Sequence, residues 1–192
     1  PYVAPKKYFD LYDRSLIEIP NCGEDYLATL PLPAAKSIRA KEEQINLEEE
    51  LAKEIKEAYY ATTSFVDAQL GRVLKKLKQT GLDKNTIIVF TSDHGYHLGE
   101  HGHWQKQTLF ENATRVPLVF SIPWTQNTIK RTITPVELID IYPTILDLVE
   151  IEIPDNVVGK SLKPLMLKKI SNIRNSALTK LNNGYSIKTE QY

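Results

Sequence analysis

The sequence predicts an α/β fold with a mostly parallel sheet flanked by helices. A long segment with apolar residues at steps of three and four begins near Asn46. Two short runs rich in β-branched and aromatic residues follow, over 86–90 and 115–123. A second segment with helical periodicity covers 134–151. This order of helix, strand, crossover, strand and helix is typical of α/β proteins.

The composition fits one globular domain, or the larger part of one. The chain has 192 residues, of which 42% are apolar and 25% charged, enough to bury a core. Lys+Arg and Asp+Glu both number 24, so we expect neither nucleic acid nor an acidic membrane surface as the main partner. The chain contains no run of about 18 apolar residues, the length that a helix needs to span a bilayer. A single cysteine, Cys22, excludes an internal disulfide and a cysteine-based zinc site.

Residues 1–45 are expected to form an irregular segment that wraps the core. Prolines such as Pro5, Pro20 and Pro31 punctuate it, and proline fixes φ and removes a backbone donor. The part over 27–37 is therefore predicted to be irregular surface chain.

One long amphipathic helix is predicted from about Asn46 to Gly81. Its apolar stripe is formed by Leu47, Leu51, Ile55, Ala58, Thr62, Val66, Leu70, Val73 and Leu77. Glutamates in the first turns and lysines in the last turns favour the helix macrodipole. At ~1.5 Å per residue the helix would span roughly 50 Å, and we expect a kink near 61–64.

The runs 86–90 and 115–123 are predicted to be buried strands. Continuous β-branched and aromatic residues are expected where both faces of a parallel sheet are covered. The helix over 134–151 should bend at Pro143, which removes a backbone donor. Residues 184–189 are predicted to form a late strand.

The segment TSDHGYHLGEHGHW, residues 91–104, contains all four histidines of the chain. Asp93 and His94 follow the first predicted strand, and ligands of open α/β sheets bind just past the carboxyl ends of strands. A carboxylate and an imidazole at this place can both reach one cation, while Gly95 lets the chain turn away. Equally, Asp93 can cap the next turn and His94 can be an ordinary surface residue.

Two side chains are too few for a metal site. Ca²⁺ takes about 6 to 8 oxygen ligands, Mg²⁺ about 6 and Zn²⁺ about four ligands. No second acidic cluster at a strand end is visible, so the sequence indicates half of a site. His97 and His101 are four residues apart with Glu100 between them, but the order differs from H-E-x-x-H and the nearby glycines disfavour a helix. A loop with hydrogen-bonded histidines is the favoured interpretation.

Lys106 lies twelve residues after His94. Beside a metal ion, a lysine can neutralise a sulfate or phosphate ester, or charge that develops in the transition state. The alternative is a solvated surface lysine, and composition does not choose between the two.

The segment TIIVFTSDHGYHLGEHGHWQKQTLFENATRVPLVFSIP, residues 86–123, resembles the sulfatase family, in particular its iduronate-2-sulfatase-like branch. The shared pattern is a strand, SDHG, GEHG-x-W-x-K and a T-x-VPL strand. The resemblance implies an alkaline-phosphatase-like α/β sandwich with a mostly parallel or mixed sheet, here incomplete. It implies that 1–45 wraps the sulfatase domain, that 46–165 is the C-terminal part of the catalytic domain, and that 166–192 begins a truncated C-terminal subdomain.

The same resemblance implies the chemistry. Family members hydrolyse sulfate esters with a formylglycine made from Cys or Ser in a C/S-x-P/A-x-R motif, and a Ca²⁺ ion orients the sulfate. Asp93 and His94 would be two of the calcium ligands, shared with acidic residues outside this chain. Lys106 would contact the sulfate as a catalytic residue, and Tyr96 and His97 would face the substrate.

The nucleophile motif itself is missing from this chain. CGEDY, which starts at Cys22, lacks the Pro or Ala and the Arg. SIPWT, which starts at Ser121, has Thr125 in place of the Arg. We therefore expect the formylglycine upstream, in a missing N-terminal part of the sulfatase domain, and an isolated chain without activity.

The resemblance implies a sulfated carbohydrate as substrate and a periplasmic, secreted or lysosomal location. The alternatives are a metal-dependent phosphodiesterase or phosphonate monoester hydrolase of the same superfamily, and a non-catalytic sulfatase fragment. His101, His103 and Cys22 receive no role from the sequence.

Overall fold

The computed structural model describes residues 2–22, 25–38, 44, 47–125 and 128–191. The chain divides into two compact units, Pro1–Pro123 and Trp124–Tyr192. The boundaries expected after residues 45 and 165 stay predictions.

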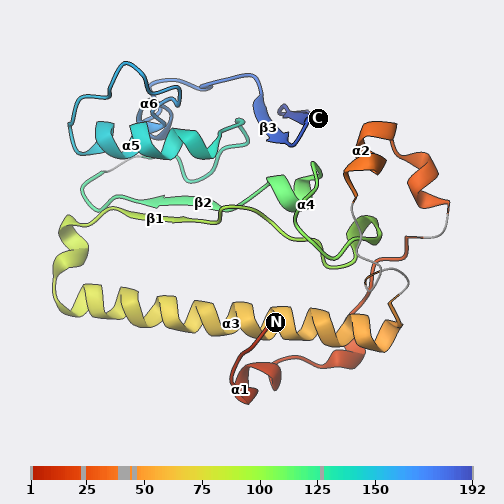
Figure 1. The fold of residues 1–192 in the computed structure, drawn as a ribbon. Helices are drawn as coiled ribbons and strands as arrows, with labels where there is room; N and C mark the ends of the chain where they lie inside the picture. Colours follow the sequence, from red (N-terminus) through yellow and green to blue (C-terminus); the bar gives the residue numbers. More distant parts are fainter. Residues whose placement is uncertain (1, 23–24, 39–43, 45–46, 126–127, 192) are drawn as a thin grey trace. The chain divides into compact units, whose positions relative to one another are not determined.

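The first unit contains α1 (Lys6–Phe9), the 3-10 helices η1 (Arg14–Leu16) and η2 (Tyr26–Thr29), α2 (Leu32–Ser37), α3 (Glu49–Gln79), η4 (Leu82–Asn85), β1 (Ile88–Thr91), η5 (Glu100–Gly102), α4 (Glu111–Thr114) and β2 (Leu118–Ser121). The second contains η6 (Leu138–Asp140), α5 (Ile141–Leu148), α6 (Lys163–Met166), β3 (Ala177–Leu181) and β4 (Gly184–Lys188) (Figure 1). The irregular chain predicted over 27–37 was wrong, because η2 and α2 lie there. Pro33 is in the first turn of α2, where its missing N–H is not needed.

The long helix is confirmed. α3 has 31 residues and ends just before Gly81, whose left-handed φ of 73° stops it. The kink expected near 61–64 is absent from the continuous helix. There the hydroxyls of Thr62 and Thr63 donate to carbonyl oxygens one turn earlier, without breaking the helix.

Only the first half of α3 is well covered within the described part of the first unit. Its Ala52 packs with Leu98 and Trp104 in a buried cluster. Further along, the side chains of Val66 and Val73 are 57% and 64% exposed. Within the described ranges no helix, α3 included, combines the length and apolarity of a membrane span.

The N-terminal segment lies against α3. The Arg14 guanidinium donates to the buried Glu57 carboxylate over 2.7 Å. The hydroxyls of Tyr12 and Ser64 are 2.6 Å apart and share a hydrogen bond. These contacts fix the segment along α3, and Figure 1 shows α1 on the side of the helix away from β1 and β2.

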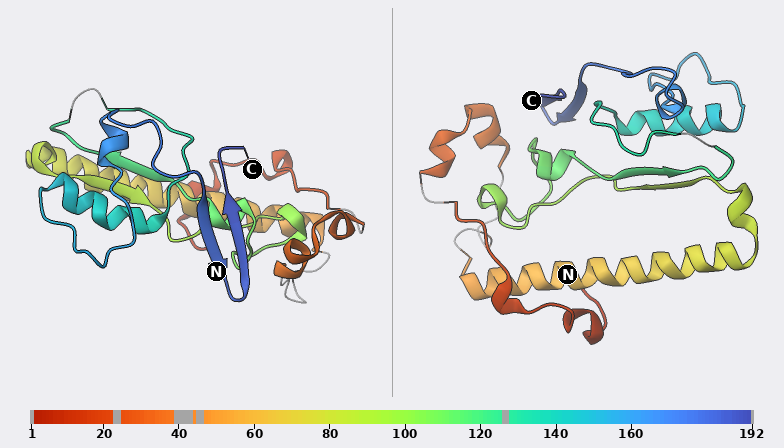
Figure 2. Two further views of the ribbon diagram at one scale, coloured as in Figure 1. Left: turned by 90° about the horizontal axis from the view of Figure 1, so that it is seen from above. Right: turned by 180° about the vertical axis from the view of Figure 1, so that it is seen from behind.

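β1 and β2 pair antiparallel, with Ile88 opposite Ser121 and Thr91 opposite Leu118. The parallel pairing expected for these two strands was wrong. Their connection contains only the short η5 and α4 and no long crossover helix, so the chain doubles back. Figures 1 and 2 show that the chain reverses at η4 and that the two strands run back along α3.

In the second unit α5 starts at Ile141, later than predicted. Pro143 therefore lies in its first turn, and the bend expected there is absent. β4 confirms the strand predicted over 184–189, and it pairs antiparallel with β3, which was not predicted.

A buried ion pair holds the second unit together. Asp140 is fully buried; it accepts a hydrogen bond from the backbone N–H of Lys160 (2.8 Å) and pairs with Arg174 (2.5 Å). Burial raises the pKa of Asp140 and lowers the pKa of Arg174. Glu137 also pairs with Arg174 and accepts from the backbone N–H of Leu178 (2.7 Å). The start of α5 is thereby tied to β3.

Candidate active site

The loop between β1 and α4, residues 92–110, is closed by its own backbone. N–H groups of its first arm donate to carbonyl groups of the returning chain: Gly95 to Ala113 (2.8 Å), His97 to Gln105 (3.0 Å) and Gly99 to His103 (3.0 Å). Gly99, His101 and Gly102 have left-handed φ values of 101°, 58° and 66° at its tip. The dense histidine segment is therefore an ordered hairpin-like loop.

Gly95 is required by close approach. A Cβ atom at this position would lie 2.0 Å from the carbonyl oxygen of Asn112. The sequence predicted that Gly95 lets the chain turn away, and the structure adds that no side chain fits between the loop and α4.

Asp93, His94 and Lys106 come together on the exposed edge of this loop. Nζ of Lys106 is 2.8 Å from Nε2 of His94, and Oδ2 of Asp93 is 3.6 Å from the same nitrogen. The Asp93 side chain is 86% exposed and the His94 side chain 35% exposed. The Asp93 carboxylate and the Lys106 ammonium, thirteen positions apart in the sequence, thus both approach one imidazole nitrogen.

The tautomer of His94 follows from its partners. Nδ1 is 2.7 Å from the carbonyl oxygen of Gly95, which only accepts, so Nδ1 carries the proton. Nε2 then has the lone pair, and Lys106 donates to it. A ring nitrogen fixed in this way is suited to bind a metal ion.

Asp93 and His94 supply one carboxylate and one imidazole. Within the described ranges, no group of three or more His, Cys, Asp or Glu side chains is placed to hold a metal ion. The Asp93 carboxylate fits one oxygen position of a calcium ligand set, and the remaining ligands would come from elsewhere.

His97 lies on the opposite, buried side of the loop. Its side chain is fully buried; Nδ1 donates to the carbonyl of Glu100 (3.2 Å) and Nε2 accepts from the hydroxyl of Thr108 (2.8 Å). Burial, helped by the neighbouring His103, lowers the pKa of His97 to about 4. Both nitrogens are used within the protein, so the lone pair of His97 is not available to a metal ion.

His101 and His103 also belong to the loop interior. His101 stacks on Phe110 with ring centroids 4.0 Å apart, and its Nδ1 is 2.5 Å from the hydroxyl of Tyr26. His103 is 1% exposed, and neither ring nitrogen has a partner among the described residues. Burial, with a smaller contribution from His101, lowers the pKa of His103.

Tyr96 is half-buried and anchors the loop to α3. Its ring stacks on Tyr59 and lies edge-on to Tyr2, with centroids 5.7 Å and 6.0 Å apart. Burial, with a hydrogen bond to Tyr96, raises the pKa of Tyr2. The substrate contacts expected for Tyr96 and His97 stay predictions.

No sequence pattern indicated Thr108 as the partner of His97. The two residues are eleven positions apart in an irregular loop, where no periodicity relates them. Cys22 is half-buried with its thiol 3.8 Å from the carbonyl oxygen of Gly99, away from the exposed edge.

Comparison with known proteins gives a consistent result. The Sulfatase family matches residues 8–151. A sulfatase from Formosa agariphila is 39% identical over 198 aligned positions, covering 100% of this chain and 38% of the relative. Human iduronate 2-sulfatase is 36% identical over 123 positions, covering 64% of this chain and 19% of the relative. The chain thus spans much less than half of the relatives it matches.

Solved structures agree. The phosphonate monoester hydrolase SpPMH from Silicibacter pomeroyi has a TM-score of 0.79 and 33% identity, covering 94% of this chain and 38% of that structure. BT4656, solved with its substrate D-glucosamine-2-N,6-O-disulfate, has a TM-score of 0.61 and 31% identity, covering 74% of this chain and 31% of that structure. The predicted alkaline-phosphatase-like α/β fold is confirmed, in partial form.

Proposed function

This chain belongs to the sulfatase family, and we propose that it supplies one part of a calcium-dependent active site that hydrolyses sulfate esters. The observation that carries the proposal is the meeting of Asp93, His94 and Lys106 around Nε2 of His94, just after β1. Because the chain spans 38% of the Formosa agariphila relative, the activity is proposed for the complete protein.

The metal would be held by the exposed edge. The Asp93 carboxylate and the Nε2 lone pair of His94 are the two donors, and acidic residues outside this chain would complete the set. A bound calcium ion supplies positive charge that orients and polarises the sulfate group. The hydrogen bond from Nδ1 to Gly95 keeps the His94 ring in the orientation that this role needs.

Lys106 would bind the sulfate group of the substrate. Its ammonium group donates to Nε2 of His94, and this nitrogen could not accept that hydrogen bond while it served as a metal ligand. Lys106 would then turn to the ester oxygens, where its charge stabilises the anion of substrate and transition state.

Tyr96 and His97 would form the wall behind this edge. Tyr96 packs on Tyr59 and His97 is held by Thr108, so both would position the loop against the substrate. The nucleophile, a formylglycine, would come from outside this chain.

We propose a sulfated carbohydrate as the substrate. The support is that BT4656, which resembles this chain, was solved with a glucosamine disulfate, and that a relative is an iduronate 2-sulfatase. A phosphonate monoester is the second candidate, because SpPMH also resembles this chain over most of its length.

The two candidates are separated by measuring turnover of an aryl sulfate and of an aryl phosphonate monoester by the complete protein. We expect the higher kcat/KM on the sulfate, and a reversed preference would favour the phosphonate hydrolase. The 192-residue chain alone should turn over neither ester. Clear turnover by the isolated chain would contradict the half-site.

A further inference from the structure

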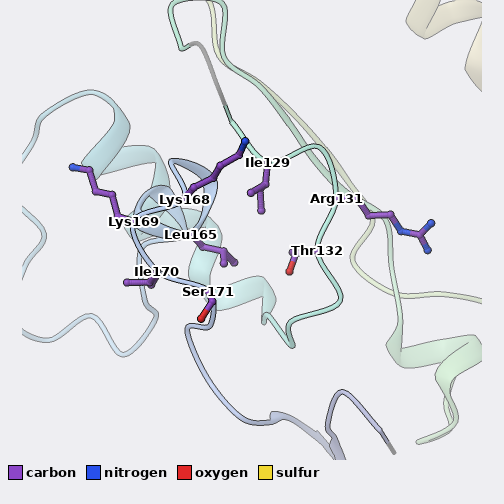
Figure 3. Close-up of a pocket in the computed structure, with 8 residues that line it drawn as sticks. All are labelled: Ile129, Arg131, Thr132, Leu165, Lys168, Lys169, Ile170 and Ser171. Atoms are coloured by element: carbon purple, nitrogen blue, oxygen red, sulfur yellow. The ribbon is translucent and has the colours of Figure 1, made fainter.

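The second unit has an open pocket of about 340 Å³ between two segments that are distant in sequence (Figure 3). Ile129, Leu165 and Ile170 give it apolar surface, and Thr132 and Ser171 contribute hydroxyl groups. The pocket therefore offers both apolar contact and hydrogen bonding to a ligand.

The backbone fixes the two segments against each other. The N–H of Ile129 donates to the carbonyl of Met166 (2.9 Å), and the hydroxyl of Thr134 donates to the carbonyl of Ser171 (3.3 Å). Lys168 has a left-handed φ of 58° because it lies just past the C-cap of α6, where its N–H donates to the carbonyl of Leu165 (3.0 Å) and the N–H of Lys169 donates to the carbonyl of Pro164 (2.9 Å). The pocket is thus built by the fold.

Three cations surround it: Arg131, Lys168 and Lys169. Arg131 and Lys168 are exposed, and the described part of the chain places no ion-pair partner beside either. Figure 3 shows that the three side chains leave the pocket in different directions. They do not converge on one small anion, and they suit a ligand whose negative charges are spaced apart.

Arg72, Lys75 and Lys76 form another group of cations, on the C-terminal part of one helix, α3. Only Lys76 of the three lies in the last turn, where the macrodipole favours positive charge. Arg131 lies on irregular chain, and Lys168 directly follows the C-cap of α6, a helix of only four residues.

We propose that this pocket is an accessory binding site for a sulfated oligosaccharide. The choice of ligand class rests on the proposed function, while the site rests on the geometry of the second unit. Sugar rings and their hydroxyl groups suit the apolar and hydroxyl side chains that line the pocket. Spaced sulfate groups would pair with Arg131, Lys168 and Lys169. A nucleic acid fits less well, because no aromatic side chain lines the pocket for base stacking.

The test measures binding of a heparin-derived hexasaccharide to the 192-residue chain by calorimetry, without turnover. The variant combines Arg131→Gln, Lys168→Asn and Lys169→Gln; asparagine tolerates the left-handed φ at 168. The control combines Lys7→Gln, Lys36→Gln and Lys84→Gln, which removes the same charge from exposed positions of the first unit. Circular dichroism checks that both variants are folded.

We expect the pocket variant to bind about tenfold more weakly, as the loss of several exposed charge contacts predicts, and the control to bind as the unaltered chain does. Desulfated hexasaccharide should not bind. Absence of binding by the unaltered chain, equal loss in the control, or equal affinity for a single-stranded DNA oligomer would overturn the proposal. This binding experiment involves no ester hydrolysis. A negative result would therefore overturn the accessory site only, and the proposed sulfatase activity is tested separately by turnover.

Discussion

The two sides of the loop over 92–110 use the same residue type for opposite purposes. His94 is on the exposed edge, with Nε2 facing Asp93 and Lys106. His97, three residues later, is fully buried, uses both nitrogens inside the protein and has a pKa lowered to about 4 by burial. The depth of a histidine in the fold, more than the density of histidines in the sequence, determines whether its ring nitrogens face the surface or are used inside the protein.

The buried side also explains how the exposed side keeps its shape. The backbone pairs of Gly95, His97 and Gly99 close the loop, and Leu98 and Trp104 pack it on α3. We therefore expect changes on the exposed edge to affect activity without stability, and changes on the buried side to affect stability first.

The largest effect is expected for Lys106→Ala in the complete protein. Loss of a positive group beside the developing charge should lower kcat/KM by about 10²–10³-fold. The unfolding free energy should change by less than about 0.5 kcal/mol, because Lys106 is exposed. Sulfate release and thermal unfolding measure the two quantities, with the exposed Lys84→Ala as control. Full activity of Lys106→Ala would remove Lys106 from the site.

The next effect is expected for Gly95→Ala in the isolated chain. The new Cβ would meet the carbonyl oxygen of Asn112 at 2.0 Å, so the loop must move, at a cost of about 3 kcal/mol. Gly71→Ala is the control: it lies inside α3 with nothing within 4 Å of the new atom, and should stabilise the helix by up to about 1 kcal/mol. Urea unfolding measures both. Similar stabilities for the two variants would show that the loop and α4 do not approach closely.

A smaller effect is expected from the pH dependence of stability. His97 has a folded-state pKa of about 4, below the ordinary 6.5, so the unfolded chain binds the proton more readily. This contribution to stability is complete above pH 6.5 and is lost as the pH falls towards 4, by roughly 3 kcal/mol. His103, His101 and Glu100 face the same ring and contribute to the curve.

Comparison with His97→Gln isolates this contribution. Unfolding free energies of both proteins are measured from pH 7.5 to pH 4, and their difference should shrink as the pH falls. A constant difference would mean that His97 is protonated equally in the folded and unfolded chains.

Local periodicity predicted the regular elements, and longer-range features escaped it. The apolar stripe and Gly81 located α3 within a few residues, because both signals are local. The antiparallel direction of β1 and β2 is set by their connection, which composition does not encode. β3 was missed because its five residues alternate between half-buried and exposed and gain stability only from β4.

For the site, the sequence placed Asp93 and His94 after a strand and counted too few ligands for a metal. The contact of Lys106 with His94 crosses twelve positions of irregular loop, so only the family resemblance suggested a shared role. Which histidines are buried depends on how Leu98 and Trp104 pack the loop on α3 and on ring contacts with Phe110, which no pattern within the loop reveals.

We propose that the exposed edge of the loop, and not its buried side, holds a catalytic cation. The most direct test titrates sulfate ester hydrolysis by the complete protein with Ca²⁺, for the unaltered protein and for Asp93→Ala. We predict that Asp93→Ala needs about 100-fold more Ca²⁺ for half-maximal activity while its thermal stability is unchanged. An unaltered calcium requirement at full rate would contradict the account.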